Sequence, residues 1–273
     1  MIYLSPKSDV AFKKLFGNIV HKNILISFLN SVLKRPEHLK IVDVIINDPA
    51  NTPDRPSGKY SIVDLRCTDQ KGHQYIVEMQ VIDQKDYIAR AQYYTAIALA
   101  RQLNSGELLP VIFVGILDFE LFNNKNYLSH QFILDSETYA HELKHLEFHF
   151  IELPKFNKTE AQLDNILDKW VYFLKNAEVL QKVPIALKET EFSEAFGVLA
   201  RSNWSNKELL EYDQYLDIWR SEVGRTESAE ERGLAKGKLE VAIDMLKANF
   251  DVEVIAQMTK LSIEQVQELK NKS

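Results

Sequence analysis

The sequence predicts an α/β protein in which several β-strands are followed by a long helical region. Two observations carry this prediction. Apolar residues recur at helical spacing between residues 9 and 33, and a helical pattern returns from about residue 158. Between these two regions, short β-rich runs alternate with turn residues and one helical segment. Strands and helices in this arrangement are typical of the α/β class.

The first helical region is expected to begin at Ser5-Pro6, because serine is a common N-cap and proline is tolerated in the first turn. A break near Gly17-Asn18 divides the region into one or two helices. Residues 41–47 are the first expected strand. Three prolines and a glycine between residues 48 and 58 then predict a loop.

A β-hairpin is expected next, with strands at residues 59–68 and 73–82. A polar turn that ends in Gly72 joins two β-rich runs, which is a common hairpin signal. A helix follows at residues 83–105, and Gly106 is expected to end it.

The remaining chain supplies two more strands and a helical end. Residues 110–117 are continuously apolar and predict a buried strand, and residues 147–153 predict a shorter one. Two short helices around a turn are expected at the end of the chain. Ser262 should cap the second, since Gln265 stands three residues later.

The bulk composition is that of a soluble globular protein: 273 residues, 45% hydrophobic and 26% charged. The single cysteine, Cys67, excludes an internal disulfide and fits a reducing cytoplasm. No signal peptide is expected, and the longest apolar run is well short of the roughly 20 residues that a membrane helix needs. The expected location is cytoplasmic, nucleoid-associated at most. The net charge of −6 does not favour a nucleic-acid binder, unless the positive charge is local or a metal adds it.

The hairpin brings two carboxylates together. A three-residue loop, Gln70-Lys71-Gly72, with the glycine in the left-handed conformation pairs residue 69 with residue 73. This register places Asp64 directly opposite Glu78, with Cβ atoms about 4.5–5.5 Å apart. On the second strand, Glu78 and Gln80 share one face, while the other face is apolar and suited to a core.

Two ionised carboxylates at that separation repel each other, and a cation between them removes the repulsion. Carboxylate oxygens, waters and substrate phosphate are the usual ligands of Mg²⁺. The alternative is that Asp64 and Glu78 are solvated side chains on an open sheet face, since strand register can slip.

A chain-long set of segments resembles one known family. Residues 62–67 (IVDLRC) and 72–80 (GHQYIVEMQ) resemble the Asp…Glu-x-Gln signature of the Rpn family of recombination-promoting nucleases and transposases, within the PD-(D/E)xK nuclease superfamily. The opening helices, the central helix, the later strands and the C-terminal tail resemble the family as well (5–17, 90–107, 110–122, 167–176 and 236–270). The resemblance implies a restriction-endonuclease-like core, with a mixed β-sheet flanked by helices and a helical C-terminal extension.

The same resemblance implies metal-dependent endonuclease activity on DNA. Asp64 and Glu78 would hold Mg²⁺, for which Mn²⁺ can substitute, and the carbonyl of Met79 is a further candidate ligand. Asp9 matches an acidic position that often completes such sites. Gln80 stands where many superfamily members have lysine; an amide can orient water but cannot take its proton. The general base would then come from elsewhere.

Three further residues are candidate substrate contacts. Arg90 and Tyr93 lie one turn apart on the expected helix after the hairpin. One face of this helix could be directed toward the carboxylates. The competing interpretation of Tyr93 and its neighbour Tyr94 is packing in the core. Lys13 belongs to a locally basic N-terminal region that suits a phosphate backbone, although a solvated helix face explains such charges more often.

His141 and His145 match the HExxH pattern of zinc proteases. That motif needs a helix and a third ligand, whereas this run leads into a strand-like segment. A zinc hydrolase is therefore the remote alternative. The tail resembles a small helix-turn-helix, but its acidic residues argue against tight DNA contact, and self-association is an equal expectation.

We therefore expect a Mg²⁺-dependent endodeoxyribonuclease that is recombination-promoting or linked to mobile elements. Its partners are DNA and, through the C-terminal helices, further copies of the chain. A nucleic-acid-binding or regulatory protein that cleaves poorly is the main alternative. The expected domains are a nuclease-like domain at 1–175, a helical extension at 176–240 and the helix-turn-helix-like tail at 241–273.

Overall fold

The computed structural model describes residues 2–47 and 64–272. The chain divides into two compact units, Met1–Tyr215 and Leu216–Ser273, and the boundary falls inside one helix. The expected three-part domain division stays a prediction.

The strands are β1 Val44–Asn47, β2 Leu65–Asp69, β3 Gln74–Gln80, β4 Val111–Leu117, β5 Leu128–Phe132 and β6 Leu146–Glu152. The helices are α1 Asp9–Phe16, α2 Lys22–Leu33, α3 Tyr87–Arg101, α4 Ile166–Asn176, α5 Thr190–Leu199, α6 Asn206–Lys247, α7 Val252–Thr259 and α8 Ile263–Lys272.

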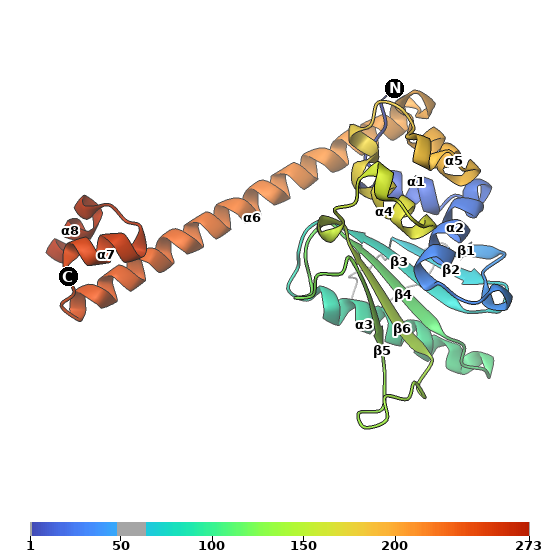
Figure 1. Cartoon of the computed structure of the whole chain (residues 1–273), viewed down its shortest axis with the longest axis horizontal. Coiled ribbons are helices and arrows are strands. Elements are labelled where there is room, and N and C mark those ends of the chain that lie inside the picture. Colours follow the sequence, from blue (N-terminus) through green and yellow to red (C-terminus); the bar gives the residue numbers. More distant parts are fainter. Residues whose placement is uncertain (1, 48–63, 273) are drawn as a thin grey trace. The chain divides into compact units, whose positions relative to one another are not determined.

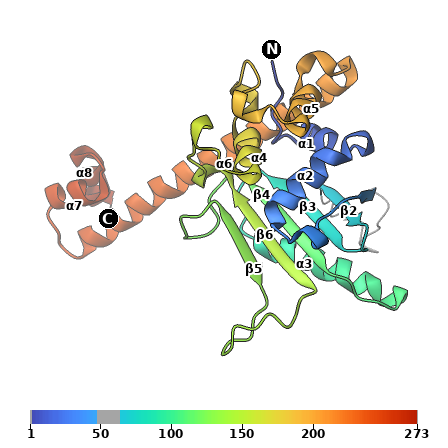
Figure 2. The same ribbon diagram turned by 45° about the vertical axis from the view of Figure 1, so that its right-hand side comes forward.

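The first unit is built on a six-stranded mixed sheet in the order β1-β2-β3-β4-β6-β5. Strands β3, β4 and β6 run parallel, and the other neighbours pair antiparallel. Helix α3 covers one face of the sheet, and α2 lies on the opposite side with α1, α4 and α5 packed around it (Figures 1 and 2). The expected α/β fold, a mixed sheet flanked by helices, is confirmed.

The continuous apolar run at β4 is explained by its central place in the sheet. All seven of its residues are buried, because helices cover both faces. On the α3 side, the core is made of Ile76, Tyr87, Phe113 and Phe150 with their neighbours.

Several expected boundaries were wrong. Helix α1 begins at Asp9, since its N-cap is Ser8, whose hydroxyl accepts a hydrogen bond from the Ala11 N–H at 3.2 Å; Ser5-Pro6 precedes the helix. Helix α3 begins at Tyr87, later than the expected residue 83. The expected strand residues 59–63 lie outside the described residues. Strand β5 was not expected. It is a short strand at the edge of the sheet, and its central residues are polar, so it lacks the apolar run that would have indicated a strand.

In the second unit, α7 and α8 pack against the end of α6 around Ala242, Ile255 and Val266. The expected cap of α8 is confirmed. The Gln265 N–H donates to the Ser262 hydroxyl at 3.2 Å, and the Ser262 N–H donates to the Gln265 side chain at 2.9 Å. Across the described ranges of both units, no helix is long and apolar enough to cross a membrane.

Candidate active site

The hairpin between β2 and β3 has the expected register. Leu65 pairs with Val77, and Gly72 adopts a left-handed conformation with φ of 83°. The Asp69 N–H donates to the His73 carbonyl at 3.0 Å, which pairs residue 69 with residue 73. One step beyond Leu65 and Val77, the same register sets Asp64 opposite Glu78.

The carboxylate of Asp69 organises this turn, a role that the sequence interpretation missed. One of its oxygens accepts the N–H groups of Lys71 and His73 at 2.8 and 2.9 Å. The other accepts the Tyr75 hydroxyl at 2.8 Å and faces the His73 ring at 3.0 Å. An aspartate directly before a short loop is the available signal, because its side chain can bond the backbone two residues on.

Asp64 is fixed by a backbone contact across the hairpin. Its Oδ2 atom accepts a hydrogen bond from the Met79 N–H at 2.7 Å. The pKa of Asp64 is raised to about 6, first by burial and then by the negative charge of Asp9, while the Met79 N–H and Lys13 oppose the shift. Helix α1 thus places a carboxylate and an ammonium close enough to act on Asp64.

Glu78 lies deeper than the sequence interpretation supposed. The alternative interpretation made its face of the sheet open, but α3 covers that face and leaves Glu78 only 6% exposed. Burial, and then the charge of Asp64, raise the pKa of Glu78 to about 8, against the opposing charges of Arg90 and Arg66. The solvated-surface interpretation is therefore wrong for Glu78, while Asp64 is half-buried.

Gln80 ends β3 on the same face as Glu78. Its side chain is half-buried, and its amide nitrogen donates to the Ile82 carbonyl at 3.0 Å. One N–H of the amide is therefore held by the local backbone, and the amide oxygen can accept a further hydrogen bond. A role in orienting water stays a prediction.

Asp9 approaches the pair from the first turn of α1 but has its own partner. Lys13, one helical turn later, lies 2.8 Å from the Asp9 carboxylate. Within residues 2–47 and 64–272, no three His, Cys, Asp or Glu side chains form a group that could hold a metal ion. A metal site at Asp64 and Glu78, with or without Asp9, therefore stays a prediction.

Arg90 and Tyr93 differ in their relation to the site. Arg90 is half-buried, donates to the Gln84 side chain, and lies close enough to Glu78 to lower its pKa. Tyr93 is 40% exposed, and its ring packs against Tyr94 with centroids 5.8 Å apart. Both substrate roles stay predictions.

Two residues near the carboxylates were missed by the sequence interpretation. Arg66 lies on β2, two residues after Asp64 and therefore on the same face, and its charge lowers the pKa of Glu78. Strand periodicity could have found it. Tyr87, the first residue of α3, packs over the same face and is 1% exposed. Nothing in the local sequence indicates that Tyr87 packs over this face.

The HExxH pattern does not form the helix that a zinc site of this kind requires. Residues 139–145 lie outside any helix or strand, so the two histidines do not share a helical face. The His141 ring instead packs against Phe132, with centroids 5.0 Å apart. The zinc interpretation of this motif was wrong because it depended on helical spacing.

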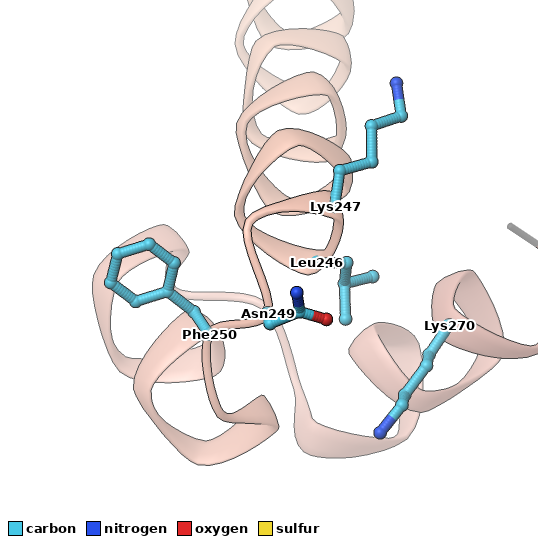
Figure 3. A pocket seen from close by; sticks show the side chains of 5 residues that line it. All are labelled: Leu246, Lys247, Asn249, Phe250 and Lys270. Atoms are coloured by element: carbon cyan, nitrogen blue, oxygen red, sulfur yellow. The ribbon is translucent and has the colours of Figure 1, made fainter.

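A separate pocket in the second unit has a volume of about 320 Å³ (Figure 3). Its lining consists of Leu246, Lys247, Asn249, Phe250 and Lys270. It offers no carboxylate, imidazole or thiol, so it lacks the groups that hydrolytic chemistry would use.

Comparison with protein families gives one match. The family described as PD-(D/E)XK nuclease family transposase matches residues 6–223, which include all the residues of the carboxylate site. Searches among curated proteins and among solved structures gave no match.

Proposed function

This chain belongs to the PD-(D/E)XK nuclease family transposases, and we propose that it is a Mg²⁺-dependent endonuclease that hydrolyses phosphodiester bonds in DNA. The observation that carries the proposal is the pair of carboxyl groups on Asp64 and Glu78. They lie opposite each other across a hairpin, and both have pKa values raised by burial. Perturbed carboxyls of this kind are typical of functional sites.

The donor set fits a hard divalent cation. Bringing two negative charges together in a buried place is unfavourable, and a cation between them removes that cost. Asp64 and Glu78 would hold the ion, with the Met79 carbonyl as a further oxygen ligand. Mg²⁺ prefers such oxygens, usually with several waters. When bound, it would supply a lowered pKa for water and positive charge for the phosphoryl group.

The surrounding residues have distinct roles in this proposal. Arg66, Arg90 and Lys13 supply positive charge near the carboxylates and would contact DNA phosphates. Gln80 would orient water through its amide without acting as the base. Local charge of this kind reconciles DNA binding with an overall net charge of −6. Besides DNA, the proposed partner is a second copy of the chain, bound through the C-terminal helices.

Nicking of supercoiled plasmid tests the proposal. The full chain should nick DNA with Mg²⁺ or Mn²⁺ and lose this activity in EDTA. The near-isosteric variants Asp64→Asn and Glu78→Gln should each be inactive while remaining folded by circular dichroism. Equal cleavage by the wild type and both variants would overturn the assignment.

The amide at Gln80 favours a second candidate, a protein of this fold that binds DNA without cutting it. DNA binding with no cleavage in either metal, and with no effect of Asp64→Asn, would select that candidate.

A further inference from the structure

Tyr87 places a buried hydroxyl beside the carboxylate site. Its ring packs against Phe113, Phe119 and Phe150, with centroids 6.2–6.4 Å apart. Its hydroxyl oxygen is buried and has no hydrogen-bond partner within the described part of the chain. Leaving a buried hydroxyl unpaired costs about 1–3 kcal/mol. A phenylalanine would fill the same apolar pocket without that cost.

Gly115 shows where this hydroxyl lies. In the parallel pairing of β3 and β4, Gly115 is the partner of Glu78. A Cβ atom on Gly115 would lie 2.5 Å from the Tyr87 oxygen. The hydroxyl therefore occupies the space above Gly115, on the face of the sheet from which Glu78 projects.

Charge supports the same placement. The pKa of Tyr87 is raised well above its ordinary value, first by burial and then by the charges of Glu78 and Asp64. The phenol O–H is a hydrogen-bond donor, and carboxylate oxygens are acceptors. Among the groups that act on it, the Glu78 and Asp64 carboxylates are such acceptors.

We propose that Tyr87 is a positioning residue, whose hydroxyl is unpaired in the metal-free protein, donates a hydrogen bond to one Glu78 oxygen when a divalent cation is bound, and so orients the carboxylate toward that cation. This inference rests on the proposed function, because it requires a cation at Asp64 and Glu78. Groups that orient metal ligands typically change metal affinity or activity by about 10–100-fold when removed.

Titration calorimetry of the DNA-free full chain with Mn²⁺ tests this role. Tyr87→Phe should weaken Mn²⁺ binding about 10-fold or more. Its melting temperature without metal should stay the same or rise, since an unpaired buried hydroxyl has been removed. Tyr139→Phe is the matched control, because Tyr139 is 75% exposed in a loop and should bind Mn²⁺ like the wild type.

Glu78→Gln separates the two ways in which the proposal can fail. If Glu78→Gln binds Mn²⁺ weakly and Tyr87→Phe binds it like the wild type, the role of Tyr87 is overturned and the metal site stands. If Glu78→Gln itself binds like the wild type, the proposed metal site is overturned. A lower melting temperature for Tyr87→Phe with unchanged Mn²⁺ affinity would show a purely structural role and also overturn the inference.

Discussion

The Met79 N–H donates a 2.7 Å hydrogen bond to Oδ2 of Asp64. This contact ties the residue that precedes β2 to the strand that carries Glu78. It fixes one oxygen of Asp64 against the backbone of that strand. The contact also orients the Asp64 side chain through the backbone of the partner strand. The hairpin itself therefore determines how the two carboxylates lie relative to each other.

The carboxylate pair should make the metal-free protein less stable as pH rises. The pKa values of Asp64 and Glu78 are raised from ordinary values of 3.8 and 4.5 to about 6 and about 8. The folded state therefore holds protons that the unfolded chain releases, and this stabilisation is present at low pH and lost as pH rises through those values. Each unit of difference corresponds to about 1.4 kcal/mol.

Urea denaturation between pH 4 and pH 9, in EDTA, measures this effect. Glu78→Gln should flatten the curve and be more stable than the wild type at the alkaline end, whereas the exposed control Glu137→Gln should keep the wild-type slope. Addition of Mg²⁺ should restore wild-type stability most at high pH. A wild-type stability that rises across this window would contradict the raised pKa values of Asp64 and Glu78.

Asp69 should be needed for the stability of the hairpin. Its side chain accepts from two backbone N–H groups and from the Tyr75 hydroxyl, and it is 2% exposed. Asp69→Ala leaves these donors unsatisfied, and we expect a loss of about 3–5 kcal/mol in the free energy of unfolding. Asp135→Ala is a matched control: Asp135 also accepts from nearby N–H groups, but in an exposed loop. Equal unfolding curves for the two variants would contradict this role.

Gly115 and Tyr87 should be energetically coupled. A Cβ at position 115 meets the Tyr87 oxygen at 2.5 Å, and the Phe150 and Phe113 rings at 3.0 and 3.1 Å. Gly115→Ala should therefore cost about 1–3 kcal/mol through overpacking. Tyr87→Phe should recover part of that cost, because it removes the nearest atom. A double-mutant cycle by urea denaturation measures the coupling, and strictly additive effects would contradict the contact.

Lys13 should matter more for DNA than for folding. Its pair with Asp9 is substantially exposed, and such pairs contribute about 0–1 kcal/mol. Lys13→Gln should leave the melting temperature nearly unchanged but weaken DNA binding, and should lower the salt dependence of log Kd by about one unit. Lys22→Gln removes a comparable exposed pair, with Asp43, and should bind DNA like the wild type. Equal salt slopes for wild type and Lys13→Gln would remove Lys13 from the interface.

The sequence by itself determined the hairpin and its register. A three-residue loop that ends in a left-handed glycine allows few geometries, and Gly72 predicted the register that sets Asp64 opposite Glu78. The buried strand β4 and the cap of α8 were local signals of the same kind. Strand β5 carries no such signal, since an edge strand need not be apolar.

Only the tertiary structure decided how this carboxylate pair is surrounded. The packing of α3 buries Glu78 and brings Tyr87 over Gly115, while α1 carries Asp9 and Lys13 to Asp64 from about fifty residues away in the chain. Burial and the charges of distant segments depend on how separate elements pack, and these set the pKa values. Turn geometry is settled within a few residues, and so the sequence determined the position of the two carboxylates, whereas the fold determined their electrostatics.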